Sequence, residues 1–128
     1  MGLMLGEWQT TDDDATVAYV TELALLRRSD KQRDRVEISP EQLHLAAVQA
    51  DQRAAELNRP IRVIGWYHSH PHITVHPSDV DLATQHRQQQ LDQRFFGAIV
   101  ACYNDGADKA HQMRLTCFQA RQSTSDAR

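Results

Sequence analysis

The chain has 128 residues, of which 41% are hydrophobic and 24% charged, and its 14 basic and 17 acidic side chains leave a net charge of −3. This length suits one domain with a single core and is too short for two domains. The composition is too apolar for a wholly disordered chain. The charge balance supplies no positive field for a phosphate backbone, no apolar run approaches the ~20 residues that span a bilayer, and no basic-then-apolar leader opens the sequence. We therefore expect a cytosolic or nuclear protein with no direct nucleic-acid or membrane partner.

The N-terminal quarter predicts a β-hairpin. Residues 1–8 are compactly apolar and predict a buried strand that lacks its beginning, while residues 15–26 are β-branched and aliphatic and predict a second strand. Residues 9–14, which end in three aspartates, predict the polar turn between them. Residues 27–35 hold five basic and two acidic side chains without an apolar period, which favours a solvated loop. The alternatives for this segment are a contact site for an acidic partner and, less favoured, a contact site for nucleic acid.

The centre of the sequence begins with a clearly marked helix. Ser39 can cap it, Pro40 suits its first position, and Gln42 stands where a capping box places Glu or Gln. Small and aliphatic side chains then recur every three or four residues as far as the Asn-Arg-Pro at 58–60. The remaining elements follow in chain order: a strand over 61–67, a helix over 78–92, and strands over 95–103 and 112–120. This order predicts an α/β or α+β fold with a mixed sheet flanked by helices, in one domain over 1–120 with a polar tail over 121–128.

Several residues receive a structural interpretation. Cys102 and Cys117 lie in strand-like apolar segments with no CxxC neighbour, so we expect reduced, buried thiols rather than a bridge or a redox pair. Glu7 follows the apolar part of the first strand and is expected to be a surface carboxylate. Trp66 and Tyr67 are expected to be packing residues on alternate faces of a strand, and Phe95 and Phe96 are expected to be core residues before they are ubiquitin contacts.

The unusual feature of the sequence is histidine, because five of the seven histidines lie within residues 68–86. His68 and His70 are two apart on a predicted strand, so their side chains point to the same face and can converge on one ion. Imidazole nitrogens suit zinc, and Asp81 is the nearest carboxylate that can supply a third ligand and leave the fourth position for water. The alternatives are hydrogen-bonded histidines and, for Ser78 and Asp81, a plain helix start, because Ser-x-x-acid is itself a capping pattern.

These residues resemble a known signature. His68-Ser69-His70, seven residues, Ser78, two residues and Asp81 resemble the H-[ST]-H-x7-S-x-x-D pattern of the JAMM, or MPN+, zinc metalloprotease family, and the flank Gly65-Trp66-Tyr67 also fits. Further segments resemble one subfamily, the deubiquitinating subunit of the BRISC complex and of its nuclear relative built around Abraxas; these lie at 26–31, 34–43, 70–75 and 116–119. The similarity covers nearly the whole chain, which is identified as a member of this family.

The resemblance implies an MPN/JAMM-like fold and a role for each matched residue. It implies one Zn²⁺ per chain, with three protein ligands: His68, His70 and Asp81. Ser78 would donate a hydrogen bond that steadies the oxyanion, while the metal would lower the pKa of a bound water toward ~7 and polarise the scissile isopeptide carbonyl. No acyl-enzyme is then expected, and the cysteines are not nucleophiles. His72 and His76 are expected to be loop residues near substrate rather than extra ligands, because a catalytic zinc keeps its fourth site open.

One part of the family pattern does not match. The family's general base is a glutamate just upstream of a Met-Gly-Leu strand, and this sequence begins at Met1 of that stretch. Glu7 is no substitute, because a displacement of eight residues along a strand moves a side chain about 26 Å. The hairpin between Trp8 and Leu26 is also shorter than the family's usual connection. The polypeptide as given is therefore expected to bind zinc but to turn over slowly, since loss of a general base commonly lowers the rate about 10²–10⁴-fold.

The favoured interpretation is a zinc-dependent deubiquitinase that hydrolyses lysine-63-linked ubiquitin chains. The resemblance implies a catalytic subunit in the cytoplasm and nucleus, acting in a BRISC-like complex or in DNA repair beside an Abraxas-type scaffold subunit of the MPN-minus kind. Such subunits pair partly through C-terminal helices, and this sequence ends at Arg128, so stable pairing of this polypeptide is not expected. The alternative is a catalytically impaired or non-catalytic zinc-binding MPN scaffold subunit.

Overall fold

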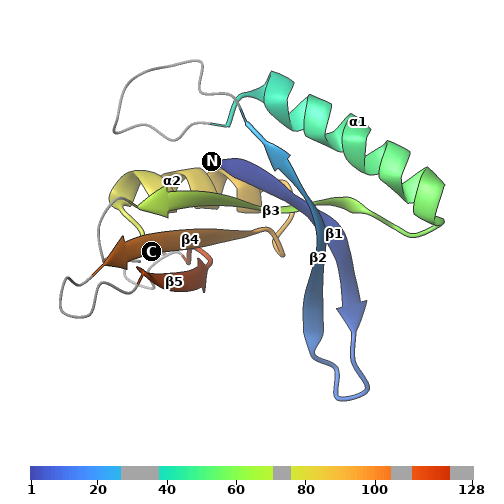
Figure 1. The fold of residues 1–128 in the computed structure, drawn as a ribbon. Coiled ribbons are helices and arrows are strands. Elements are labelled where there is room, and N and C mark those ends of the chain that lie inside the picture. The colour runs from blue at the N-terminus through green and yellow to red at the C-terminus, as the bar shows by residue number, and fades with distance from the viewer. Residues whose placement is uncertain (27–37, 71–75, 105–110, 122–128) are drawn as a thin grey trace, which may run out of the picture.

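The computed structural model describes residues 1–26, 38–70, 76–104 and 111–121, and these form one sheet and two helices (Figure 1). In chain order the elements are β1 (Gly2–Thr10), β2 (Thr16–Leu25), α1 (Pro40–Leu57), β3 (Arg62–His70), α2 (Asp79–Gln89), β4 (Phe96–Asn104) and β5 (His111–Phe118). The predicted loop at 27–35, the tail beyond 121 and most of the turn between the last two strands lie outside the described residues. No described helix is long and apolar enough to cross a membrane.

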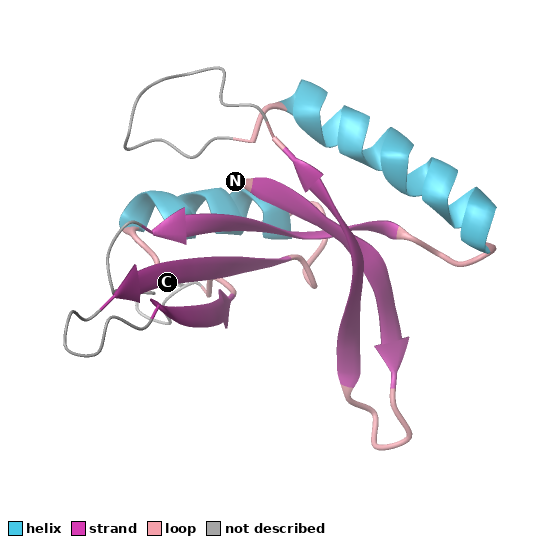
Figure 2. Cartoon of the chain, viewed as in Figure 1, coloured by secondary structure: helices cyan, strands magenta, loops and turns pink. Residues whose placement is uncertain are grey.

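The sheet has five strands in the order β2-β1-β3-β4-β5 (Figure 2). Neighbouring strands are antiparallel except β3 and β4, which run parallel. Parallel neighbours need a crossover, and α2 supplies it between these two strands. The predicted mixed sheet flanked by helices and the predicted N-terminal hairpin are therefore confirmed.

Helix α1 begins and ends where the sequence predicts. The Ser39 side chain accepts a hydrogen bond from the Gln42 backbone N–H, the Gln42 side chain accepts one from the Ser39 backbone N–H, and Pro40 takes the first turn. Asn58 ends the helix in the left-handed conformation at φ 52°, which short polar side chains tolerate well.

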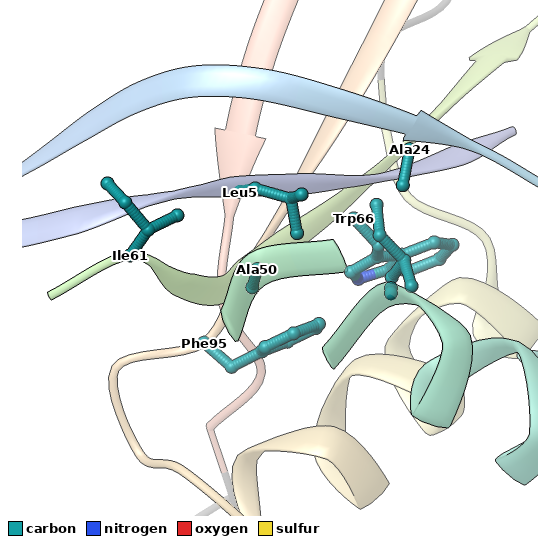
Figure 3. Packing of buried hydrophobic residues seen from close by; sticks show 8 residues of the cluster. Leu5, Ala24, Ala50, Ile61, Trp66 and Phe95 are labelled. Atoms are coloured by element: carbon teal, nitrogen blue, oxygen red, sulfur yellow. The ribbon is translucent and has the colours of Figure 1, made fainter. Parts of the chain in front are cut away.

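The core lies between the sheet and the helices. Figure 3 shows the packing of its main cluster, which consists of Leu3, Leu5, Ala24, Ala46, Ala50, Ile61, Trp66 and Phe95. Trp66 is fully buried in this cluster, against the small side chains of α1, and also contacts Gln85 of α2. Both helices therefore pack against the sheet face that carries Trp66, and the prediction that Trp66 and Phe95 are core residues is confirmed.

The opposite face of the sheet carries a second, smaller buried cluster of Met4, Ile64 and Ala98, against which Tyr67 and Phe96 pack partly buried. This cluster does not extend over the two cysteines, which corrects the prediction for them. Cys102 and Cys117 are free, as expected, but exposed. Cys117 pairs with Ala98 in the sheet, whereas Gly97, one residue away, faces Trp66 and the helices. Because side chains alternate along a strand, both thiols lie on the face that neither helix covers. The apolar character of these segments therefore predicts the strands correctly but not the exposure of the two thiols.

Glu7 also differs from the prediction. It is 4% exposed rather than a surface carboxylate, and it accepts hydrogen bonds from the Arg59 guanidinium and from Gln9. Its place agrees with the expectation that it is not the general base. Gly2 pairs with Tyr67 near the histidine end of β3, and Glu7 lies five residues further along β1.

The ion pair of Glu7 predicts a pH dependence of stability. The hydrogen bond from Arg59, and next that from Gln9, hold the pKa of Glu7 below its ordinary value. A group with a lowered folded-state pKa stabilises the fold above its unfolded pKa of about 4.3, and this contribution is lost as the pH falls through the folded value. We expect Glu7→Gln to be less stable than the wild type at pH 7 and the gap to narrow between pH 5 and pH 3 in urea unfolding.

A matched control for this prediction lies on the surface of α1. Glu56 pairs with Arg53 at 2.8 Å, but its side chain is 62% exposed. Glu56→Gln should therefore change the free energy of unfolding little at any pH. A constant gap between Glu7→Gln and wild type down to pH 3 would contradict the role assigned to the Glu7 carboxylate.

Candidate metal centre

Two histidines and one aspartate meet where β3 ends and α2 begins. His68 and His70 lie on the same face of β3, as their spacing predicts, and Asp81 lies in the first turn of α2. The Nε2 atoms of the two histidines are 3.0 Å apart, and they lie 3.1 Å and 3.2 Å from Oδ2 of Asp81. These three residues form a group that can hold a metal ion.

The chemistry of this donor set fits a divalent transition metal. Ligand atoms about 2.0–2.1 Å from a tetrahedral zinc lie roughly 3.3 Å from one another, close to the spacing of these three atoms. Two imidazole nitrogens and one carboxylate oxygen are also the ligand types that zinc accepts in sites with an open fourth position. Hydrogen bonds alone account for this arrangement less well than a shared metal ion does. The Nε2 atoms of His68 and His70 both face Oδ2 of Asp81 and also face each other.

The ionisation of the ligands suits a cation. Burial lowers the pKa of His68, although the nearby Asp81 carboxylate acts in the opposite direction. Burial by itself would raise the pKa of Asp81, but the backbone N–H of Ser78 and then the neighbouring His68 outweigh it, so the pKa of Asp81 lies below its usual value. At neutral pH the site therefore presents a neutral imidazole and an ionised carboxylate, the forms in which these groups bind metals.

Ser78 is the N-cap of α2. Ser78 and Asp81 therefore form a helix start, as the alternative interpretation of the sequence expected, and Asp81 also belongs to the possible metal group. The Ser78 hydroxyl accepts the backbone N–H of Asp81 at 3.1 Å, and Oδ2 of Asp81 accepts the backbone N–H of Ser78 at 2.9 Å. This reciprocal capping box fixes Asp81 at a rigid helix start. The proton of the Ser78 hydroxyl is not used in any hydrogen bond among the described residues.

Two predicted loop residues are not brought into the group. His76 is exposed and lies outside the cluster of possible ligands in the described part of the chain. His72 lies outside the described residues. The expectation that both lie near a substrate stays a prediction.

Two other residues support the group, and sequence reasoning missed their role. Trp66 stacks on His68 with ring centroids 4.8 Å apart and an angle of 12° between the planes. Trp66 is held in turn by Gln85, whose side-chain oxygen accepts the indole N–H at 2.7 Å. The only sequence signal for Gln85 is its spacing of four from Asp81, which places both on one face of α2.

The fold is thus a mixed-sheet domain whose strand–helix junction brings together two imidazoles and a carboxylate that could hold a metal ion. The chain belongs to the family described as JAB1/Mov34/MPN/PAD-1 ubiquitin protease, which matches residues 1–94. That range contains the three metal-group residues and Ser78. The resemblance stated from the sequence motif is therefore confirmed at the level of the family.

Curated relatives are close in sequence. The chain is 49% identical over 124 residues to the Lys-63-specific deubiquitinase BRCC36 of Xenopus tropicalis, covering 96% of this chain and 46% of that protein. It is 48% identical over 121 residues to the BRCC36 of Camponotus floridanus, covering 94% and 46%, and 49% identical over 112 residues to a BRCC36-like deubiquitinase of Mus musculus, covering 87% and 38%. The chain thus spans less than half the length of these relatives.

Proposed function

We propose that this chain is the catalytic domain of a zinc-dependent deubiquitinase that cleaves lysine-63-linked ubiquitin chains. The observation that carries the proposal is the group of buried His68 and Asp81 and partly buried His70, whose three donor atoms lie 3.0–3.2 Å apart. The names of the relatives, Lys-63-specific deubiquitinases, support the choice of substrate.

In this proposal each residue has a defined task. The two histidines and Asp81 would hold the zinc ion. When bound, the ion would lower the pKa of a water molecule and polarise the scissile carbonyl. The Ser78 hydroxyl donates a hydrogen bond to the oxygen of the substrate carbonyl as negative charge develops there. Because its oxygen is fixed by the Asp81 backbone N–H, this donor is already oriented before substrate arrives.

The proposal extends to cofactor, partners and location. We propose that the protein binds one zinc ion per chain and acts on ubiquitin chains. Its proposed partner is an Abraxas-type scaffold subunit of a BRISC-like complex, and its proposed location is the cytoplasm and the nucleus, with a part in DNA repair. Sedimentation of the chain alone and mixed with such a scaffold subunit tests the partner, and co-sedimentation would contradict the expectation that residues 1–128 alone do not pair stably.

The test of the function measures zinc per chain by elemental analysis and cleavage of lysine-63-linked diubiquitin, with lysine-48-linked diubiquitin as the linkage control. The family pattern reads Glu-Val-Met-Gly-Leu, with the glutamate as general base, so the assay compares residues 1–128 with the same chain extended at Met1 by Glu-Val. We expect one zinc in both, and cleavage that is about 10²–10⁴-fold faster with the extension. Zinc binding without cleavage by either polypeptide would contradict the enzymatic proposal, and absence of zinc would contradict the site.

A further inference from the structure

Gln85 is a fully buried polar side chain between the two elements that carry the metal group. It lies on α2, one helical turn beyond Asp81, and it contacts Trp66, two residues before His68 on β3. A buried amide is unfavourable unless its groups are hydrogen-bonded, so its partners indicate what it holds in place.

Every polar atom of the Gln85 amide has a partner. Its oxygen accepts the Trp66 indole N–H at 2.7 Å, and its nitrogen donates to the Phe95 backbone oxygen at 2.6 Å and to Oε1 of Gln89 at 2.6 Å. An indole N–H only donates and a backbone carbonyl only accepts, so the amide can stand in one orientation only. Gln85 therefore ties α2 to β3 and to the segment that enters β4.

The next turn of α2 continues this connection. Gln89 lies four residues after Gln85 and accepts the Ala120 backbone N–H at 2.7 Å, while its nitrogen donates to the Ala120 backbone oxygen at 2.9 Å. Asp81, Gln85 and Gln89 thus lie along one side of the helix. Two amide contacts fix the position of α2 along its axis, and with it the position of the Asp81 carboxylate.

The ring of His68 depends on Trp66. A ligating histidine usually donates its second ring N–H to a carboxylate, carbonyl or water, which fixes the ring. The Nδ1 atom of His68 is buried and has no hydrogen-bond partner among the described residues. Its ring lies instead against the parallel indole of Trp66. The orientation of His68 therefore follows that of the indole, and Gln85 fixes the indole.

We propose that Gln85 is a positioning residue of the metal centre, acting on His68 through Trp66 and on Asp81 through α2. This inference rests on the proposed function, because it assumes that the group of His68, His70 and Asp81 binds a metal. Outer contacts of metal ligands typically contribute 10–100-fold to metal affinity, and we expect Gln85 to contribute about tenfold.

The test compares two substitutions of glutamine on the same helix. Gln85→Met keeps a similar volume and removes all three hydrogen bonds of the amide, whereas Gln90→Met alters the exposed C-cap residue of α2. Co²⁺ is titrated into the 128-residue chain while its visible absorption, which reports ligand geometry, is recorded. We expect Gln85→Met to bind Co²⁺ about tenfold more weakly with a changed spectrum, and Gln90→Met to match wild type.

A second variant separates positioning from general stability. Trp66→Phe keeps an aromatic ring against His68 but removes the indole N–H. If Gln85 acts through Trp66, then Gln85→Met should change the Co²⁺ affinity clearly less in the Trp66→Phe chain than in wild type. Additive effects, or a Gln85→Met chain with wild-type affinity and spectrum, would overturn the proposal. Should Gln85→Met not fold, Trp66→Phe alone must show the weaker binding and altered spectrum, and wild-type behaviour there would overturn it.

The same titration distinguishes loss of the metal centre from loss of the positioning role of Gln85. Failure of the wild-type chain itself to bind Co²⁺ or Zn²⁺ would remove the metal centre and the positioning role with it. Wild-type binding that Gln85→Met leaves unchanged would remove only the positioning role.

Discussion

Replacing Asp81 by asparagine is expected to weaken metal binding by this chain more than about 100-fold while leaving the fold intact. Asparagine has the same shape and can still accept the Ser78 backbone N–H, so the start of α2 stays capped. It lacks the negative charge of the only carboxylate among the three donor atoms. We expect the affinity for zinc to fall by more than about 100-fold, beyond the range seen for outer contacts of metal ligands.

The measurement is zinc affinity by competition with a chromophoric chelator, with unfolding by urea as the check on folding. Asp79→Asn is the matched control, because Asp79 lies in the same first turn of α2 but is exposed and outside the metal group. Equal affinities for Asp81→Asn and wild type would remove Asp81 from the site. Activity on lysine-63-linked diubiquitin in the extended chain should disappear with the metal.

The largest expected loss of stability follows from Trp66→Ala. Trp66 is fully buried between β3, α1 and α2, and truncating a buried tryptophan costs about 3–5 kcal/mol in the free energy of unfolding. The cavity would also leave the Gln85 amide oxygen without its partner and His68 without its stacking ring. Since domains are stable by only about 5–15 kcal/mol, this variant should be largely unfolded at moderate temperature.

The chain's other tryptophan supplies the control. Trp8 is half-buried near the turn end of the hairpin, beneath the guanidinium of Arg94 and against Phe96. Trp8→Ala should lower the free energy of unfolding clearly less than Trp66→Ala, measured in urea by circular dichroism so that the loss of an indole does not bias the signal. Equal losses would contradict the central place given to Trp66.

The sequence predicts the local features of this fold well, because they depend on neighbouring residues. The capping boxes at Ser39 and Ser78 each need only a residue three positions further on, and the period of two on a strand suffices to bring His68 and His70 to one face. Strand ends are less certain. Strand β1 continues to Thr10, into the expected turn, since β2 pairs with it along its whole length.

What the sequence does not predict depends on contacts between distant residues. The partner of Glu7 is Arg59, 52 positions away, and no local pattern joins them. The exposure of Cys117 follows from which face of the sheet the helices cover. Gln85 and Trp66 are 19 positions apart and meet only because α2 folds back over β3. A polar residue in the middle of a helix therefore carries no sequence signal that separates a buried bridge from a solvated side chain.

The capping box of α2 affects the entropy cost of cation binding. The oxygen that Asp81 offers to the ion is the same atom that accepts the Ser78 backbone N–H. The rotamer of the Asp81 side chain is fixed when the helix forms, before any ion binds. Ion binding therefore costs little further side-chain entropy. Loading should accordingly be quick and should leave the backbone of α2 where it already stands.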